Sequence, residues 1–436
     1  MACRPCAPFV PDGGATLPGV GGAAYPGRMD PLAALGLPSP ALNATGTSTR
    51  AGAARLSPEV RAAMDAAAGL SFDMAALHGA AGRRAADLLK VPAAFVTTGA
   101  AAALAMGAAA AIARDSIARM NRLPETEGMR HEFLVARSHR SAYDRALLLA
   151  GARLVEVGIP DRQSSAGVRD AEAGDFADAI TPRTAGILYL AQPEQEPALP
   201  ELAALARQHD LILIVDAAGQ LPPASLPDAL IAQGADLVAV SGGKAIGGPA
   251  GTGLLLGRPD LIASALLQSL DLDFLEGSFV PDPALAPALR DPRRLPTHGI
   301  GRAMKVGKEE IVGLLAALTA FTAADPAMET ARRRALVGTM AEELGRANGL
   351  VPHVVEGPAP RLEVAVDAAA LGFDARALAL ALARRDPPVL VGHRGLRTGR
   401  LVLDPANLRG EEESRALGRA LREAARRPTE SGADGT

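Results

Sequence analysis

The sequence predicts an α/β protein whose mostly parallel sheet of seven strands carries helices on both faces. Three observations lead to this fold class. Short apolar runs recur between residues 94 and 257, and each has the length of a buried strand. Stretches with helical spacing, such as 99–113 and 199–208, separate most of these runs, which is the alternation of βαβ units. Beyond residue 325 the pattern changes to a smaller α+β domain of about 100 residues, an ordinary domain size.

The expected elements follow in chain order. The seven strands are expected at 94–97, 132–136, 153–157, 186–190, 211–215, 236–240 and 253–256. One long helix at 300–323 leads out of this sheet. The smaller domain is expected to contain helices at 327–347, 375–384 and from 411, and strands at 361–366, 389–391 and 400–403. The predicted domains are a disordered N-terminal arm at 1–40, a large α/β domain at 41–322, a small α+β domain at 323–428 and a disordered tail at 429–436.

The N-terminal arm is rich in Gly, Pro and Ala, and its first 28 residues have no periodicity. Met29 is an alternative start, because the first amphipathic pattern begins there. Cys3 and Cys6 form a lone CxxC without a second pair of ligands, so we expect no metal site.

Composition limits the partners of the chain. At 436 residues and 48% hydrophobic, it is long and apolar enough for a sizeable core. A net charge of −3 provides no basic field for nucleic acid or an anionic membrane. The first residues lack the apolar region of a signal peptide, and no run approaches the ~20 apolar residues of a spanning helix. We therefore expect a cytoplasmic protein that binds a small molecule, without nucleic acid or membrane as a partner.

Lys244 lies in a glycine-rich turn between the apolar runs at 236–240 and 253–256. The chain has 45 basic residues, of which only Lys90, Lys244, Lys305 and Lys308 are lysines. A desolvated amine can lose its proton and form a Schiff base with a carbonyl, which a guanidinium cannot do. Lys244 is therefore a candidate for covalent attachment of pyridoxal phosphate, the alternative being a surface lysine in a turn.

Ligands of open α/β sheets bind at the carboxyl ends of the strands, so the residues that follow each apolar run are the candidate site. Asp216 follows 211–215, and a buried carboxylate there would keep the nitrogen of a pyridine ring protonated. The alternative is an Asp that caps the next turn.

Three small residues, Thr98, Gly99 and Ala100, open a helix after the first strand. Backbone N–H groups at such a helix start bind anions and suit the cofactor phosphate, although many strand-to-helix turns look alike. Ser241 would add a hydroxyl to the same phosphate or simply form the turn.

His139 and Arg140 follow the strand expected at 132–136. A flat imidazole at that strand end would stack on the cofactor ring, the alternative being a loop histidine. Arg140 would bind an anionic group of the substrate or lie in solvent.

Six segments together resemble one family in order and spacing. They are Asn-Ala-Thr-Gly-Thr at 43–47, Thr-Gly-Ala-Ala-Ala at 98–102, His-Arg-Ser-Ala-Tyr-Asp at 139–144, Val-Asp-Ala-Ala-Gly-Gln-Leu-Pro-Pro at 215–223, Ser-Gly-Gly-Lys-Ala-Ile-Gly-Gly-Pro at 241–249 and Ile-Gly-Arg-Ala-Met-Lys-Val-Gly-Lys-Glu-Glu at 300–310. The family is that of the fold-type-I pyridoxal phosphate enzymes similar to bacterial L-seryl-tRNA(Sec) selenium transferase, in the branch that includes D-glucosaminate-6-phosphate ammonia-lyase.

The resemblance implies a fold-type-I large domain, a Schiff base on Lys244, Asp216 on the ring nitrogen, and an active site shared across a homodimer or a higher homo-oligomer. Arg302 matches a position where the family places a basic, anion-binding residue. Lys305 and Lys308 follow it, and a helix-surface role is an equal alternative for both.

The expected activity is a lyase that eliminates water and ammonia from a small hydroxylated amino acid or amino-sugar acid. One alternative is a selenium transferase that acts on seryl-tRNA, and a second is a non-catalytic protein that binds pyridoxal phosphate. Only about 40 low-complexity residues precede the large domain, where the selenium transferases carry a tRNA-gripping domain, so the tRNA alternative is disfavoured.

Overall fold

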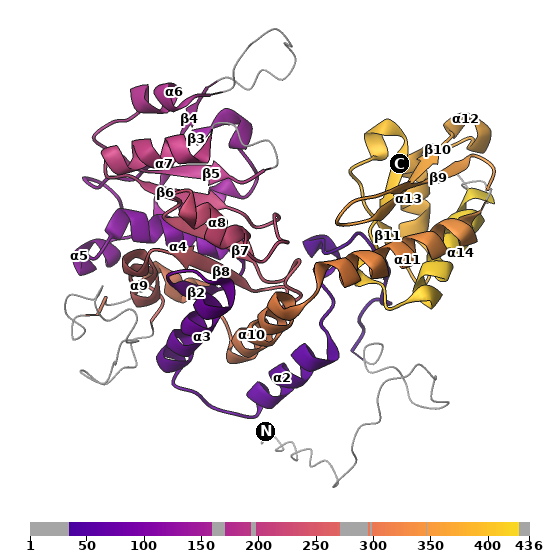
Figure 1. Ribbon diagram of the computed structural model, residues 1–436, viewed down its shortest axis with the longest axis horizontal. Helices are drawn as coiled ribbons and strands as arrows, with labels where there is room; N and C mark the ends of the chain where they lie inside the picture. Colours follow the sequence, from indigo (N-terminus) through magenta and orange to yellow (C-terminus); the bar gives the residue numbers. More distant parts are fainter. Residues whose placement is uncertain are drawn as a thin grey trace, which may run out of the picture.

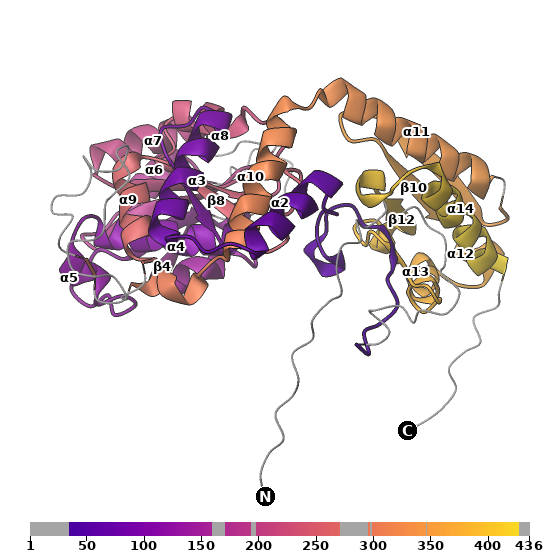
Figure 2. The ribbon, with the colours of Figure 1, turned by 90° about the horizontal axis from the view of Figure 1, so that it is seen from below.

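The computed structural model describes residues 35–158, 171–192, 198–270, 295–296, 299–345 and 347–426. Most of the predicted arm, with Cys3, Cys6 and Met29, and the predicted tail lie outside the described residues. The described chain forms a larger and a smaller lobe (Figures 1 and 2). Two helices, α10 (Lys308–Ala323) and α11 (Pro326–Leu344), lead from the first lobe to the second.

The larger lobe is built on a sheet of seven strands in the order β2-β8-β7-β6-β5-β3-β4. The strands are β2 (Ala94–Thr97), β3 (Glu132–Ala136), β4 (Arg153–Val157), β5 (Thr184–Leu190), β6 (Ile212–Asp216), β7 (Leu237–Ser241) and β8 (Gly253–Gly257). All neighbours are parallel except that β8 runs antiparallel to both β2 and β7. The predicted seven-stranded, mostly parallel sheet is confirmed.

Helices cover both faces of this sheet because successive side chains of its strands point to opposite faces. In β6, Ile212 and Ile214 join one core cluster, and Leu213 and Val215 join the other. The first face is covered by α4 (Ala100–Ala113), α5 (Ile117–Met120) and α9 (Pro259–Leu267). The second is covered by α2 (Pro58–Ala68), α3 (Met74–Leu89), α7 (Leu199–Gln208), α8 (Leu226–Ala232) and α10, with α6 (Ala173–Asp178) beside α7. Such an arrangement buries the apolar strands on both sides.

The smaller lobe contains an antiparallel sheet in the order β12-β10-β9. Its strands are β9 (Leu350–Val355), β10 (Arg361–Val366) and β12 (Arg400–Leu403), and its helices are α11, α12 (Ala368–Leu371), α13 (Ala375–Ala383) and α14 (Glu411–Arg426). A short strand from the start of the chain, β1 (Leu42–Ala44), pairs in parallel with β11 (Val389–Val391). Residues 42–44 therefore share a sheet with C-terminal residues, while the domain boundaries at 41 and 322 stay a prediction.

The prediction of one long helix at 300–323 is wrong. A short 3-10 turn at Ile300–Met304 is followed by extended backbone, and α10 begins only at Lys308. Gly307 precedes the helix with a ψ of 156°, which is not helical. Two acidic residues, Glu309 and Glu310, occupy the first turn, where negative charge stabilises a helix start.

Among the residues that the structure describes, no helix on its own is both long and apolar enough to cross a membrane. The pair α10 and α11, bent by 95°, meets the length and composition limits only when the two helices are taken together.

Candidate active site

Most of the predicted site residues lie at one edge of the large sheet. The strands β3, β5, β6 and β7 are parallel, so their carboxyl ends meet at this edge. Because β8 is antiparallel to both of its neighbours, the end of β2 and the start of β8 lie there too. The register aligns Thr97 with Gly253 and Gly253 with Ser241. Residues that are far apart in the sequence, Thr98, His139, Asp216 and Lys244, therefore follow strand ends on the same edge.

Lys244 sits in the turn that links β7 to β8. The turn closes on itself, because the N–H of Gly248 donates to the carbonyl of Gly242 at 2.9 Å. On the opposite side, Lys244 faces the turn after Asp216: a Cβ added to Gly219 would lie 3.7 Å from the Lys244 Nζ. The amine of Lys244 and the carboxylate of Asp216 thus belong to neighbouring turns.

Asp216 ends β6 and is 7% exposed. Burial raises its pKa above the ordinary value of 3.8, although the N–H of Ala218 and the charge of Lys244 act in the opposite direction. The Ala218 N–H donates to Oδ1 at 3.0 Å, and no described residue donates to Oδ2. A cationic N–H placed against Oδ2 would favour the ionised carboxylate.

The start of α4 is shaped by glycines. Gly99 has a φ of +89°, a conformation that L side chains rarely adopt. The backbone of β8 approaches closely, since a Cβ on Gly253 would lie 2.4 Å from the carbonyl carbon of Gly99 and 2.6 Å from the nitrogen of Ala100. The Thr98 hydroxyl donates to the Gly251 carbonyl at 3.3 Å. These contacts hold the first N–H groups of a 14-residue helix at the site edge, where an anion would meet them.

His139 is buried at the end of a 3-10 turn, Arg137–His139, that follows β3. Its Nδ1 accepts a hydrogen bond from the Leu190 N–H at 3.3 Å. Its ring lies edge-to-face on Tyr189, with ring centroids 4.7 Å apart and planes at 88°.

Arg140 is held by two carboxylates. Its guanidinium pairs with the buried Asp144 and with Glu156 of β4. The hydrogen bond with Asp144 is the main cause that raises the pKa of Arg140. A substrate anion at Arg140 would have to share this guanidinium, and the predicted substrate role of Arg140 stays a prediction.

Three basic residues, Arg302, Lys305 and Lys308, lie between the 3-10 turn at 300–304 and the first residue of α10. Arg302 lies in the 3-10 turn that packs against α4, and its neighbour Gly301 lies against Met106 and Ser269. Lys308 donates to the carbonyl of Ala68 at 3.1 Å and pairs with Glu309. The contacts of Lys308 are those of a helix-surface lysine, and the substrate role of Arg302 stays a prediction.

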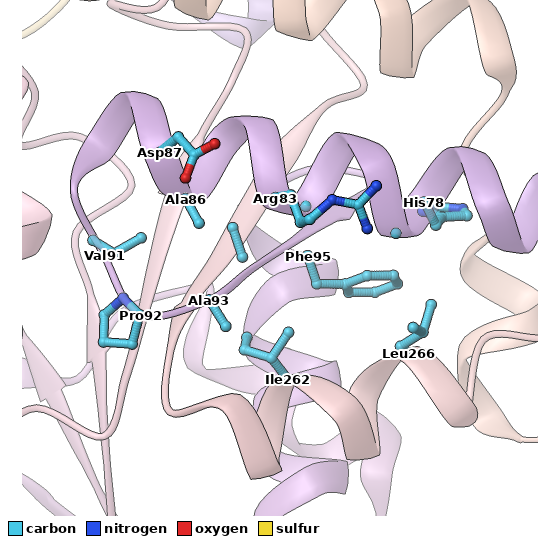
Figure 3. A pocket seen from close by; sticks show the side chains of 13 residues that line it. His78, Arg83, Ala86, Asp87, Val91, Pro92, Ala93, Phe95, Ile262 and Leu266 are labelled. Carbon is cyan, nitrogen blue, oxygen red and sulfur yellow. The ribbon is translucent and has the colours of Figure 1, made fainter. Parts of the chain in front are cut away.

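A cavity of about 170 Å³ lies elsewhere, between α3, α9 and the start of β2 (Figure 3). It is lined by His78, Gly79, Gly82, Arg83, Ala86, Asp87, Val91, Pro92, Ala93, Ala94, Phe95, Ile262 and Leu266. The rings of His78 and Phe95 lie 5.3 Å apart, and burial lowers the pKa of His78 to about 4. None of the predicted site residues lines this cavity, so we do not assign it to the active site.

Sequence reasoning missed three contributors to the site edge. Tyr189 looks like an ordinary core residue in an apolar strand, and its only signal is that it is one of three tyrosines. Gly253 has no signal beyond its place at the start of a strand. The third is a backbone contact from the N-terminal segment, in which the Ala54 N–H donates to the Gly243 carbonyl at 2.8 Å.

Comparison with known proteins agrees with this fold. The model of the aminotransferase class-V family matches residues 179–270, which include Asp216 and Lys244. The chain is 31% identical to a Streptomyces 5'-C-glycyluridine monooxygenase-decarboxylase over 87% of this chain and 88% of that one. It is 28% identical to the D-glucosaminate-6-phosphate ammonia lyase of Salmonella typhimurium over 88% of this chain and 95% of the relative. A solved structure of D-glucosaminate-6-phosphate ammonia-lyase superposes with a TM-score of 0.73 at 27% identity, over 91% of this chain and 98% of that one.

The fold and the class-V match define a pyridoxal phosphate-dependent enzyme of fold type I. L-seryl-tRNA(Sec) selenium transferases are also among its relatives. The chain belongs to the family of pyridoxal phosphate enzymes that includes these transferases, the ammonia lyase and the monooxygenase-decarboxylase. Membership in this family implies pyridoxal phosphate as its cofactor.

The substitution Gly253→Ala tests the close approach of β8 to the start of α4. The new methyl group would overlap the backbone of Gly99 and Ala100, so we expect a loss of about 1–3 kcal/mol in the free energy of unfolding, typical of overpacking. Cofactor affinity should fall as well, measured by titration of the apoprotein with pyridoxal phosphate. The matched control is Gly251→Ala, where a Cβ meets nothing within 4 Å. Equal behaviour of the two variants would contradict the role of this contact.

The substitution Asp216→Asn should stabilise the apoprotein against unfolding and lower the activity of the enzyme loaded with pyridoxal phosphate. Burial raises the folded-state pKa of Asp216, so its contribution to stability is complete below its ordinary pKa of 3.8 and is lost as pH rises through the folded value. Urea unfolding of the apoproteins should therefore favour the variant at pH 7.5 and show no difference near pH 3.5. Activity should drop about 100-fold or more, because Asn lacks the negative charge that is predicted to face the ring nitrogen of pyridoxal phosphate. Asp178→Asn, at an exposed site, is the control, and a less stable variant apoprotein at pH 7.5 would refute this account.

Proposed function

We propose that this protein is a pyridoxal phosphate-dependent lyase that removes water and ammonia from a small hydroxylated amino acid or amino-sugar acid. The observation that carries the proposal is the position of Lys244, on a turn at the carboxyl edge of the sheet and beside the turn that follows Asp216. Likeness to D-glucosaminate-6-phosphate ammonia lyase along 95% of that relative supports the reaction class.

The residues present fit the cofactor. The N–H groups at Thr98, Gly99 and Ala100 would hold its phosphate, together with the Ser241 hydroxyl. His139 would lie on its ring, and the Oδ2 of Asp216, to which no described residue donates, would accept a hydrogen bond from its ring nitrogen. When bound, the cofactor supplies an electron sink that acidifies the proton on the substrate Cα.

Lys244 would serve two purposes. Its amine would hold the cofactor covalently before substrate arrives, and the released amine would then take the proton from Cα. Loss of that proton together with the β-hydroxyl removes one water molecule from the substrate. Hydrolysis of the resulting enamine consumes one water molecule and yields a keto acid and ammonia.

The substrate anion requires a cationic partner. Arg140 and Arg302 are the proposed partners for a carboxylate or phosphate group, because guanidinium groups pair well with oxyanions. Arg140 already contacts Asp144 and Glu156, so it would bind the anion with the nitrogen edge that these carboxylates leave. We further propose that the active unit is a homodimer or a larger homo-oligomer, as enzymes of this fold commonly are, and that it acts in the cytoplasm without a nucleic-acid partner.

A second candidate function is an oxygen-dependent decarboxylation of an α-amino acid. It is favoured by the 31% identity with the 5'-C-glycyluridine monooxygenase-decarboxylase, which spans 88% of that enzyme. The selenium transferase alternative uses the same removal of the Cα proton but adds selenium in place of hydrolysis. A non-catalytic role is not proposed further, because the chain belongs to a family of enzymes.

Sodium borohydride treatment of the protein loaded with pyridoxal phosphate tests the attachment site. We expect the yellow colour to bleach and the phosphopyridoxyl group to appear on the peptide that contains Lys244, because reduction makes the linkage permanent. Peptide mass spectrometry locates the group, and Lys244→Arg is the control that should remain unlabelled. A label on Lys305 or Lys308 would defeat the assignment.

A substrate panel tests the reaction. We expect equal amounts of keto acid and ammonia, without oxygen consumption, from β-hydroxy amino acids or 6-phosphorylated amino-sugar acids, and a loss of about 100-fold or more in Lys244→Ala. Oxygen consumption with release of carbon dioxide from an amino acid linked to a nucleoside would favour the second candidate. Selenocysteinyl-tRNA formation from seryl-tRNA and selenophosphate, with no keto acid from any small substrate, would overturn the lyase proposal.

A further inference from the structure

Tyr189 is a buried tyrosine whose hydroxyl is not used by any described residue. The side chain is 1% exposed, and its hydroxyl oxygen has no hydrogen-bond partner within the described part of the chain. Burial raises the pKa of Tyr189, so the phenol is neutral at physiological pH. A buried hydroxyl without a partner is unfavourable, and phenylalanine would fill the same space without that cost. The contact that the structure shows for this side chain is made by its ring.

The ring of Tyr189 contacts one functional candidate, His139. The two rings meet at 4.7 Å with planes at 88°, the edge-to-face geometry that aromatic pairs prefer. The contact joins two strands, because Tyr189 belongs to β5 and His139 follows β3. The imidazole thus touches the end of the neighbouring strand.

The next residue of β5 holds the same imidazole at a second point. The Leu190 N–H donates to Nδ1 of His139, so Nδ1 carries no hydrogen and the ring hydrogen lies on Nε2. The edge-to-face contact limits the tilt of the ring, and the hydrogen bond limits its rotation. Two consecutive residues of one strand therefore contact the imidazole of His139, one through the edge-to-face contact of the rings and one at Nδ1.

We propose that Tyr189 is a positioning residue that, with the Leu190 N–H, holds His139 in its Nε2–H tautomer and at the tilt needed to lie on the cofactor ring. The inference rests on the proposed cofactor role of His139. A side chain that is already oriented loses little freedom when its ligand binds, so Tyr189 contributes to cofactor affinity without touching the cofactor. The energy of an aromatic pair corresponds to roughly 2- to 10-fold in affinity.

The first test reads the tautomer directly in the apoprotein. Long-range proton–nitrogen spectra of protein labelled with ¹⁵N-histidine report which ring nitrogen carries the hydrogen, and the His139→Leu spectrum identifies the His139 signals. We expect a single Nε2–H form in the wild type and in Tyr189→Phe, which keeps the ring. Tyr189→Leu should show a mixture of tautomers, because an imidazole that is no longer held at its tilt loses the hydrogen bond with the Leu190 N–H. A single Nε2–H form in Tyr189→Leu would overturn the positioning role.

The second test is a double-mutant cycle on the dissociation constant of pyridoxal phosphate, measured by absorbance titration. Tyr189→Leu should weaken binding by roughly 2- to 10-fold in the wild-type background, and Tyr189→Phe should not change it. In the His139→Leu background, Tyr189→Leu should have no further effect. An equal loss in both backgrounds would show a merely structural role and overturn the proposal.

Two outcomes separate this inference from the proposed function. If His139→Leu binds pyridoxal phosphate like the wild type, the proposed cofactor role of His139 is refuted, and the tautomer spectra alone decide whether Tyr189 positions the ring. If Tyr189→Leu does not fold, Tyr189→Met replaces it, since methionine retains more of the volume and still removes the aromatic ring.

Discussion

The tight turn between β7 and β8 is the constraint on which the candidate site depends. A Cβ on Gly242 would lie 2.3 Å from the Thr252 hydroxyl oxygen, and a Cβ on Gly243 would lie 2.7 Å from Cα of Ala250. The two arms of the turn are therefore in backbone contact just before Lys244. This closure reverses the chain so that β8 runs antiparallel between β7 and β2. The reversal brings the amine of Lys244 and the start of α4 to one edge.

The same edge combines a carboxylate that would be stabilised by a cation with N–H groups that favour an anion. Asp216 is buried where ionisation is disfavoured, and its second oxygen has no donor among the described residues. The start of α4 offers backbone N–H groups, which favour an anion. A ligand that carries both a cationic ring nitrogen and a phosphate satisfies the two together. This edge of the sheet is therefore less stable without such a ligand than with it, as is common at functional sites.

Much of the large sheet could be predicted because its strands are short, apolar runs separated by helical patterns. The candidates Thr98, His139, Asp216 and Lys244 could be selected because carboxyl ends of parallel strands carry ligands in open sheets. The helix predicted at 300–323 is too long, because an apolar periodicity does not show that α10 begins only after Gly307. The contact of Arg140 with Glu156 could not be predicted, since Glu156 lies on β4 and meets Arg140 only through tertiary structure, whereas Asp144 is a local partner four residues along the chain. Pairing of β1 with β11 joins three-residue strands from distant parts of the chain, and no local pattern indicates it.

The segment between β1 and α2 connects three parts of the molecule. β1, which precedes this segment, pairs with β11, and the side chain of Asn407 donates hydrogen bonds to the carbonyls of Gly46 and Ala53 within it. One residue later, the Ala54 N–H binds the carbonyl of Gly243, beside Lys244. A shift of the smaller lobe relative to the larger one would therefore act on the backbone beside Lys244 through residues 44–54, so the length of this segment limits how far the two lobes can move apart without disturbing that turn.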